Sequence, residues 1–410
     1  MIDKELLLVM RNHLISEFDL TRELSDEEVE RKIEEEILKQ GHHHYISLED
    51  RCLYKKALYN DFRGFDILQN YIDNDEITEI MVNGQHNIFF EKFGQIHKSD
   101  DSFISIDKLN DLVQQIASFS NRRVNETSPI ADARLKDGSR VNIVLPPVAL
   151  DGPIITIRKF HNHHISMENL IEFGSISKQA STFLETLVVA GYNIFISGGT
   201  GSGKTTFLNI LSDAIPSDSR VITIEDSAEL QIKNIPNLVR LESRQVNLEG
   251  TGEISIRDLI KSALRMRPDR IIVGEVRGSE ALDMLQAMNT GHDGSMSTGH
   301  ANSTHDMLTR LETMVLMGTE LPVNAIRGQI FAGIDIIVHL GRLRDKSRRV
   351  LEICELSEFD GNNISLNTIF KFKETGYKDS RVIGALSFTG TKLLHTTKLD
   401  LAGLEEPIYE

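Results

Sequence analysis

The sequence feature that most constrains the fold is a glycine-rich run with the spacing G-x-x-x-x-G-K-[ST]. An apolar stretch over 193–197 precedes this run, and a helix-forming stretch begins at Thr206. A buried strand, a glycine turn and a helix in this order are typical of a unit of a parallel α/β sheet. The run consists of Gly198, Gly199, Thr200, Gly201, Ser202, Gly203, Lys204 and Thr205.

Each residue type in this run has a task in holding a polyphosphate. Glycines let the backbone wrap closely around a phosphate, and the amides and the positive end of the following helix bind its charge. Lys204 is expected to reach the β- and γ-phosphates, and Thr205 to hold Mg²⁺. Together with Thr206, the run therefore predicts a binding site for ATP and Mg²⁺.

Strand-like and helix-like segments alternate after residue 178. Strands are expected at 193–197, 221–225 and 270–274, and helices at 178–190, from residue 204 and at 256–266. This alternation predicts an α/β fold in which crossover helices join parallel strands, as in a RecA-like P-loop core.

Changes in pattern divide the chain into five expected parts. They are a helical N-terminal segment (1–60), an α+β domain (61–160), a polar linker (161–177), the RecA-like domain (178–345) and a C-terminal extension (346–410). In the first part, Ser25 to Glu28 has the spacing of a capping box. In the second, strands are expected at 77–82, 87–91, 140–145 and 154–157, with an amphipathic helix over 109–119. Adjacent histidines at 42–44 and 161–164 lack the spacing of metal ligands and are interpreted as solvated turns.

Two acidic residues stand at the ends of predicted strands. Glu225 ends the strand 221–225, and Glu275 follows Gly274, which stands where many Walker B strands have an aspartate. The carboxyl ends of parallel strands meet at one edge of a sheet, where ligands of α/β proteins bind. We favour Glu275 as the residue that activates water and Glu225, beside Asp226, as a Mg²⁺ ligand, and the reverse assignment stays open.

A segment of small residues over 291–303 contains His292 and His300. Its glycines and hydroxyl groups predict a loop that approaches a ligand or a neighbouring subunit. We expect these histidines to sense the γ-phosphate.

The composition limits the partners and the compartment. The formal net charge is −16, from 45 Lys and Arg against 61 Asp and Glu. A surface this acidic repels phosphate backbones, so no nucleic-acid partner is expected. Cys52 and Cys354 cannot form a disulfide framework, which fits a reducing compartment. The N-terminus lacks the pattern of a secretory signal, so a cytoplasmic location is expected.

Three segments resemble the secretion ATPases of types II and IV, namely 223–230, 264–278 and 284–294. Within that superfamily, they resemble the CpaF group, the motors of the tight-adherence (Flp) pilus. The resemblance implies a Walker A run, an Asp box at Glu225 and Asp226, a Walker B at Glu275 and a His box at His292 and His300. It also implies ATP hydrolysis coupled to mechanical work, a homo-hexamer, and inner-membrane platform proteins that hold the protein at the inner face of the cytoplasmic membrane.

Arginines are needed to offset the charge that develops on the γ-phosphate during cleavage. In the α+β domain the candidates are Arg134, Arg140 and Arg158, which could also be surface arginines paired with Asp132 or Asp137. In the related ATPases, arginines of the N-terminal domain close over the nucleotide, which implies catalytic roles for Arg134 and Arg140 and a nucleotide-binding role for Arg158. Further candidates in the RecA-like domain are Arg240, Arg244, Arg265, Arg267 and Arg277.

Three other functions stay open at this point. One is a type IV secretion or pilus-retraction motor of the same superfamily, the second a RecA-like nucleic-acid translocase, and the third a nucleotide-binding scaffold without turnover. A translocase needs a basic groove or aromatic stacking platforms, and the net charge of −16 and the lack of Trp argue against one. The two glutamates and the histidine segment argue against a scaffold.

Overall fold

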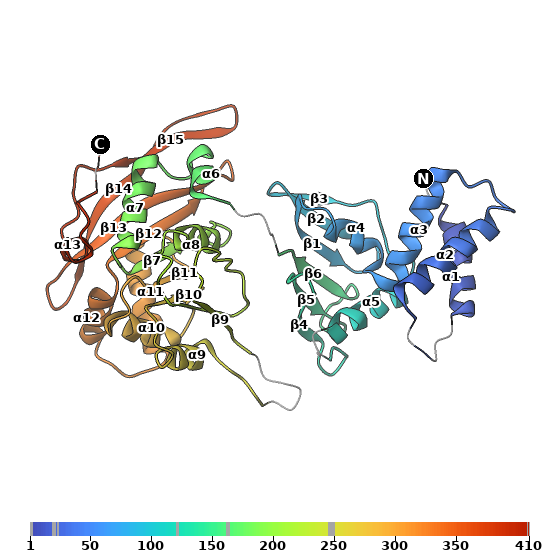
Figure 1. Cartoon of the computed structure of the whole chain (residues 1–410), viewed down its shortest axis with the longest axis horizontal. Helices are drawn as coiled ribbons and strands as arrows, with labels where there is room; N and C mark the ends of the chain where they lie inside the picture. The colour runs from blue at the N-terminus through green and yellow to red at the C-terminus, as the bar shows by residue number, and fades with distance from the viewer. Residues whose placement is uncertain are drawn as a thin grey trace. The chain divides into compact units, whose positions relative to one another are not determined.

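The chain folds into two compact units, Met1–Asn162 (unit 1) and His163–Glu410 (unit 2) (Figure 1). The structure is a computed structural model that describes residues 3–18, 22, 24–119, 123–160, 165–244, 251–407 and 409. The turn predicted at 161–164 lies outside the described residues.

Three helices open unit 1: α1 (Lys4–Glu17), α2 (Asp26–Gln40) and α3 (Leu48–Arg63). Each follows a residue whose side chain accepts a backbone N–H of the first turn, and Ser25 and Glu28 form the predicted capping box. The apolar faces of the helices enclose a core that includes Met10, Ile33 and Leu58. The predicted helices are therefore confirmed.

The rest of unit 1 is a sheet covered by a helix. Its elements are η1 (Asp66–Leu68), α4 (Gln69–Ile72), β1 (Ile77–Asn83), β2 (Ile88–Lys92), β3 (Gln95–Lys98), α5 (Ile106–Phe119), β4 (Ile130–Arg134), β5 (Arg140–Val144) and β6 (Ile154–Arg158). Within the described residues, six antiparallel strands follow the order β3-β2-β1-β6-β5-β4. The sequence does not predict β3 or β4, because β3 is exposed at every residue and β4 buries only two alanines.

Unit 2 is built on one mixed sheet. Its strands are β7 (Ile194–Gly198), β8 (Val221–Glu225), β9 (Leu238–Glu242), β10 (Arg270–Val273), β11 (Met296–Gly299), β12 (Ile336–Arg342), β13 (Arg348–Phe359), β14 (Ile364–Lys378) and β15 (Arg381–Phe388). In the part of the chain that the structure describes, the order is β15-β14-β13-β12-β7-β11-β10-β8-β9. Neighbours pair in parallel from β9 to β12 and antiparallel from β12 to β15. The predicted α/β class with a largely parallel sheet is confirmed.

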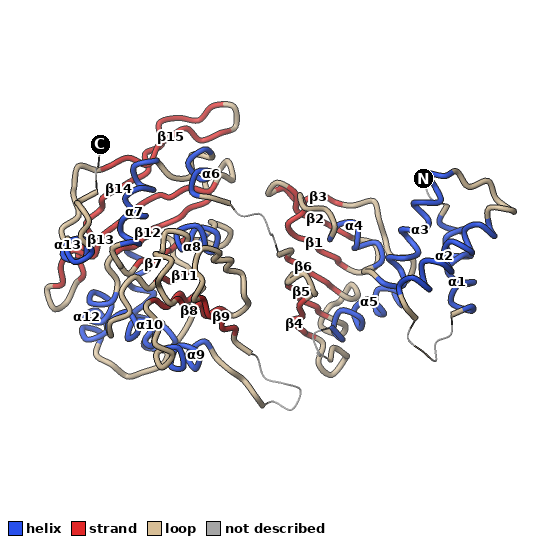
Figure 2. The backbone as a smooth tube through the Cα atoms, viewed as in Figure 1, coloured by secondary structure: helices blue, strands red, loops and turns tan. Residues whose placement is uncertain are grey.

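Helices cover both faces of this sheet (Figure 2). They are α6 (Met167–Glu172), α7 (Lys178–Val189), α8 (Lys204–Ser212), α9 (Ile256–Ala263), α10 (Glu280–Asn289), α11 (Thr304–Leu316), α12 (Val323–Gly333) and α13 (Thr397–Ala402). α7 and α8 share one core with Ile194 and Ile196 of β7, whereas α9 to α12 share the other with Phe195. Since successive strand residues point to opposite faces, β7 is buried on both sides and reads as a continuous apolar run. Among the described residues, no helix combines the length and apolar composition needed to cross a membrane.

The segment over 291–303, predicted as a loop, contains β11, which is buried at every residue. The loop prediction is wrong there because Ser297 and Gly299 carry little strand signal of their own. A Cβ on Gly299 would lie 3.0 Å from side-chain atoms of both Phe195 and Met307. The crowded space between β7 and α11 therefore selects glycine at this position, and pairing with β7 and β10 makes the segment a strand. The range 161–177, predicted as a linker, likewise contains α6.

Candidate functional site

The glycine-rich run forms a tight turn between β7 and α8. Gly198 lies so close to β12 that a Cβ on it would be 2.5 Å from the carbonyl oxygen of Leu340. Gly203 has a φ of 93° at the start of α8, a left-handed conformation that glycine adopts without strain. Ser202 Oγ donates to the carbonyl oxygen of Gly199 at 2.8 Å and closes the turn. The backbone thus curls at the carboxyl edge of the sheet, where an anion can meet the start of a helix.

Lys204 is buried in the first turn of α8, and its ammonium group lies in the glycine turn. Nζ donates to the carbonyl oxygen of Gly199 at 3.1 Å and lies 3.2 Å from Nδ1 of His300, which follows β11. Both of these acceptors are neutral. A phosphate oxygen can replace them and form a stronger, charge-assisted hydrogen bond with Lys204.

His300 connects Lys204 to Glu275. Nε2 of His300 lies 2.7 Å from Oε1 of Glu275, which follows β10. Burial lowers the pKa of His300, and the nearby charge of Lys204 lowers it further. The ring therefore favours its neutral form, with Nδ1 facing Lys204 and Nε2 in close contact with the carboxylate of Glu275, whose Oε1 makes no hydrogen bond of ordinary geometry within the described residues. Lys204 of α8, His300 after β11 and Glu275 after β10 thus form one path of contacts.

Arg277 holds the second oxygen of Glu275. Nη2 of Arg277 lies 2.7 Å from Oε2 of Glu275, and Nη1 lies 3.6 Å from Oδ2 of Asp226. The hydrogen bond to Glu275 raises the pKa of the Arg277 guanidinium. With one oxygen facing His300 and the other facing Arg277, the carboxylate of Glu275 has a fixed orientation, as a water-orienting group requires.

Glu225 explains why a glycine stands at position 274. A Cβ on Gly274 would lie 2.9 Å from Cγ of Glu225. Oε1 of Glu225 accepts the backbone N–H groups of Glu229 at 2.9 Å and Leu230 at 3.0 Å. Burial raises the pKa of Glu225, although these two hydrogen bonds oppose the shift. The side chain of Glu225 thus fills the space that an aspartate at position 274 would need.

The donor atoms at this edge fit the Mg²⁺ ion that accompanies ATP. The buried Oε2 of Glu225 has no hydrogen-bond partner among the described residues. Together with Thr205, it offers the oxygen ligands that Mg²⁺ prefers. In the sheet order, β11 and β10 separate β7 from β8, so Glu225 is further along the edge from the glycine turn than Glu275 is.

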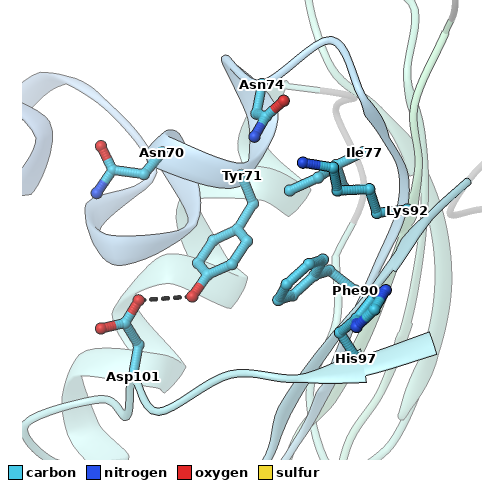
Figure 3. Close-up of a pocket in the computed structure, with 8 residues that line it drawn as sticks. All are labelled: Asn70, Tyr71, Asn74, Ile77, Phe90, Lys92, His97 and Asp101. Carbon is cyan, nitrogen blue, oxygen red and sulfur yellow. Dashed lines mark hydrogen bonds between the residues drawn. The ribbon is translucent and has the colours of Figure 1, made fainter. Parts of the chain in front are cut away.

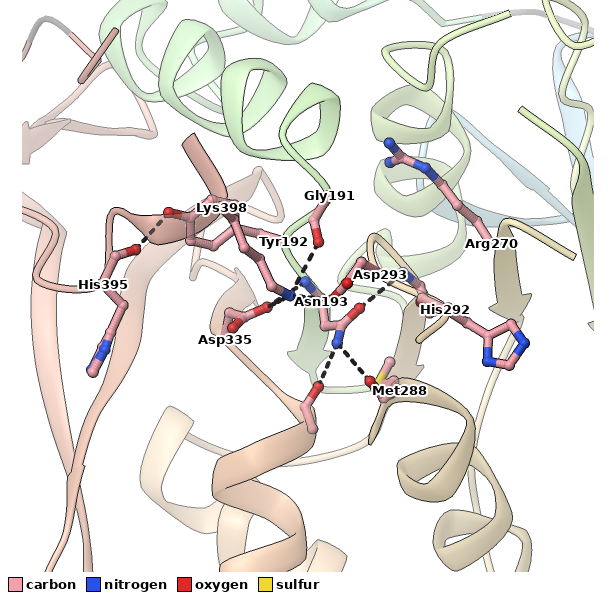
Figure 4. A network of polar contacts seen from close by, with 12 residues as sticks. Gly191, Tyr192, Asn193, Arg270, Met288, His292, Asp293, Asp335, His395 and Lys398 are labelled. Atoms are coloured by element: carbon pink, nitrogen blue, oxygen red, sulfur yellow. Dashed lines mark hydrogen bonds and ion pairs between the residues drawn. The ribbon is translucent and has the colours of Figure 1, made fainter. Parts of the chain in front are cut away.

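The two predicted histidines lie at opposite ends of β11. His300 follows its carboxyl end, whereas His292 precedes its amino end (Figure 4). There, Nδ1 of His292 lies 3.1 Å from the carbonyl oxygen of Ala287 in α10. The structure therefore does not bring His292 to the glycine turn of its own chain.

Asn193 organises the amino edge of the sheet, close to His292 (Figure 4). Its Nδ2 donates to the carbonyl oxygens of Met288 at 3.3 Å and Gly333 at 2.8 Å. Its Oδ1 accepts the backbone N–H of Ser295 at 3.0 Å. One buried amide thereby ties the ends of α10 and α12 to the strands.

The arginines predicted in unit 1 lie in one row across three strands. Arg134 of β4 stands directly opposite Arg140 of β5, which stands opposite Arg158 of β6. Directly opposed residues share a face of the sheet, so the three arginines emerge side by side. Glu79 of β1 continues the row beyond Arg158. Such a concentration of guanidinium groups is suited to binding an anion.

Unit 1 also contains a hollow of about 420 Å³ that no sequence pattern indicates (Figure 3). Phe90 and His97, opposite each other on β2 and β3, stack with their ring centroids 5.5 Å apart. The hydroxyl of Tyr71 donates to Asp101 at 2.5 Å, and burial raises the pKa of Tyr71 to about 12. Three of the eight lining residues are aromatic and the hollow has no backbone cradle like that of the glycine turn, so we assign it no role in phosphate binding.

Sequence reasoning misses His339, which lies on β12 beside the strand that leads to the glycine turn. Its Nδ1 is 2.9 Å from Oγ of Ser197, and burial lowers the pKa of His339. The available signal is a single histidine inside the apolar run 336–340. The pair fixes the last residues of β7 before Gly198.

Comparisons with known proteins agree with this geometry. The family described as Type II/IV secretion system protein matches residues 61–387. A Mycobacterium tuberculosis protein named for conjugal transfer is 34% identical over 312 residues, which cover 75% of this chain and 88% of that protein. The type IV secretion system protein PtlH of Bordetella pertussis is 33% identical over 312 residues, covering 70% of this chain and 92% of PtlH. The crystal structure of the Legionella pneumophila ATPase DotB shares the fold, with a TM-score of 0.51 and 22% identity over 71% of this chain and 80% of DotB.

Proposed function

We propose that this chain, which belongs to the type II/IV secretion system protein family, is an ATPase that couples hydrolysis to mechanical work. The observation that carries the proposal is the path from Lys204 through His300 to Glu275 at the open end of the glycine turn. A protein that only binds nucleotide needs the turn and the lysine. A carboxylate with a fixed orientation beside them serves the attack of water.

In the proposed reaction, the N–H groups of the glycine turn bind the phosphates of ATP. Lys204 exchanges Gly199 and His300 for oxygens of the β- and γ-phosphates, and His300 stays in contact with Glu275. Glu275 then orients the water that attacks the γ-phosphate. Mg²⁺, when bound through Thr205 and Glu225, neutralises charge on the phosphates.

We further propose that the arginine row of unit 1 completes the site. Arg134 and Arg140 offset the charge on the γ-phosphate, and Arg158 contacts the nucleotide. An arginine in this role increases the rate by roughly 10³–10⁵-fold.

The assembly and the cellular role belong to the same proposal. The segments 223–230, 264–278 and 284–294 resemble the CpaF group, so we propose a homo-hexamer that drives assembly, and also retraction, of a tight-adherence pilus. It acts in the cytoplasm, held at the inner face of the membrane by platform proteins. The names of the relatives, conjugal transfer and type IV secretion, favour a type IV secretion motor as the second candidate. Deleting the gene separates the two, since loss of surface pili supports the first and loss of substrate transfer the second.

Release of phosphate from ATP tests the proposed activity. We expect the wild-type chain to release phosphate at the same rate with and without single-stranded DNA, and Lys204→Ala to release none while it stays folded. Stimulation by DNA would support the translocase instead. Normal turnover of Lys204→Ala would contradict the assignment of the glycine turn, and an inactive wild-type chain would favour a scaffold.

A further inference from the structure

Two arginines outside the predicted set lie against the glycine turn. Arg342 ends β12 and Arg348 begins β13, and these strands form the hairpin beside β7. A Cβ on Gly201 would lie 3.8 Å from Nη1 of Arg342, and a Cβ on Gly203 would lie 3.4 Å from Cδ of Arg348. Both side chains therefore border the turn that wraps the phosphates.

The guanidinium groups of this arginine pair make no ion pair or hydrogen bond within the part of the chain that the structure describes. Arg342 and Arg348 stand directly opposite each other, so they share one face of the hairpin, and like charges in this arrangement destabilise a sheet. The chain has many acidic residues that could pair with arginines, since it has 61 Asp and Glu against 45 Lys and Arg. Arg344, on the same hairpin, pairs with Glu374. Both arginines are exposed, so water solvates their guanidinium groups, which remain available to an anion.

The hairpin that carries the pair is held in place at its tip. Oδ1 of Asp345 accepts the backbone N–H of Ser347 at 3.0 Å, and Oδ2 accepts that of Val382 on β15 at 2.8 Å. The strands therefore keep the two arginines opposite each other and beside the turn. Binding of an anion there would order the two side chains but would not need to rearrange the hairpin.

We infer that Arg342 and Arg348 bind the phosphates of the nucleotide in the glycine turn, on the side away from the bond that is cleaved. The inference rests on the proposed function. His300 and Glu275 follow β11 and β10, on one side of β7, whereas the pair lies beside β12, on the other side. The pair therefore contacts phosphates that ATP and ADP have in common. It stabilises both ligands and the transition state alike, which strengthens binding and leaves kcat unchanged.

Binding of ADP to the full chain tests this inference with Arg342→Gln, Arg348→Gln and the double variant. Loss of one charge-assisted hydrogen bond weakens binding by about tenfold, so we expect that factor for each single variant and more for the double. Displacement of a fluorescent ADP by inorganic tripolyphosphate should weaken in parallel, because the contacts are to phosphate. The double Arg→Lys variant should recover part of the affinity. Arg344→Gln is the matched control, and its affinity should equal that of the wild type.

The outcomes separate this inference from the proposed function. If the double variant binds ADP as the wild type does while Lys204→Ala binds none, the inference is wrong and the function stands. If Lys204→Ala binds ADP normally, the function itself is wrong. An unchanged affinity for tripolyphosphate with a weaker affinity for ADP would show contacts to the nucleoside and overturn the inference. So would a lower kcat at saturating ATP with unchanged ADP affinity.

Discussion

The two edges of the parallel sheet in unit 2 differ in how completely their polar groups are paired. At the amino edge, the amide of Asn193 is bonded through both its oxygen and its nitrogen, and Lys398 of α13 lies 2.7 Å from Asp335 (Figure 4). At the carboxyl edge, Oε2 of Glu225 has no partner among the described residues, and the arginine pair has no acid. The polar groups of the amino edge are therefore paired with one another, whereas the carboxyl edge keeps charged groups that a ligand can bind.

The same short segment supplies both edges, since His292 and His300 stand at the two ends of β11. Polar groups that are fully paired hold a structure together, whereas unpaired groups on a rigid framework are ready for a ligand. Substitutions at the carboxyl edge should therefore change nucleotide chemistry and leave stability nearly unchanged. Substitutions at the amino edge should do the reverse.

The largest expected effect is that of Glu275→Gln at the carboxyl edge. Turnover should fall by about 10²–10⁴-fold, because the glutamine amide cannot take up a proton from the attacking water. The dissociation constant for ADP and the melting temperature should stay close to those of the wild type. Steady-state phosphate release and a thermal melt measure the two quantities. Wild-type turnover would remove Glu275 from the role of activating water.

At the amino edge, Asn193→Ala should destabilise unit 2 by about 2–4 kcal/mol, because buried backbone groups lose their partners. Asn289→Ala is the matched control, since the exposed Nδ2 of Asn289 bonds to Gln329 Oε1 at 3.2 Å. We expect the control variant to lose much less stability than Asn193→Ala does. Denaturant unfolding measures both, and ADP affinity below the transition should be unchanged. Equal losses in the two variants would contradict the importance of the buried amide.

Lys398→Met should lower the free energy of unfolding by less, about 1–2 kcal/mol. The substitution removes the cation beside a carboxyl group whose charged form burial already disfavours. Burial raises the pKa of Asp335, and Lys398 opposes that shift. Lys392→Met is the control, because exposed Lys392 lies 3.7 Å from Glu406. The same unfolding experiment applies. If the control loses as much as Lys398→Met, the link between α13 and the sheet does not stabilise unit 2.

The smallest expected effect is a pH dependence at His300. Its pKa in the folded chain is below the ordinary value, so the unfolded chain takes up a proton first as the pH falls. The wild type should therefore lose stability relative to His300→Gln as the pH drops through about 6.5, and the difference should be constant at higher pH. Melting temperatures of both proteins between neutral and mildly acidic pH measure it. If the wild type instead loses stability relative to His300→Gln as the pH rises through this range, the histidine is charged in the folded chain.

Local patterns in the sequence predict much of the carboxyl edge. The run 198–205 combines glycines, a lysine and a threonine in an order that only a phosphate turn requires, and the strands before Glu225 and Glu275 are continuous apolar runs. The strand β11 could not be predicted, because the crowded space beside Phe195 and Met307 selects Gly299 and only pairing with β7 and β10 makes the segment a strand. His339 and the arginine pair could not be predicted for a related reason. The strand β12 lies far from β7 in sequence, and only sheet pairing brings the two strands together.

The sequence by itself determined that the chain has a glycine turn between a strand and a helix, a parallel sheet and acids at its carboxyl edge, because each of these depends on residues that are neighbours along the chain. The tertiary structure alone decided how these residues are used. It joined Lys204, His300 and Glu275, kept His292 at the other edge, and placed Glu225 in the space beside Gly274. The physical reason is that strand order and burial, which set those distances and charges, result from packing between segments remote in sequence.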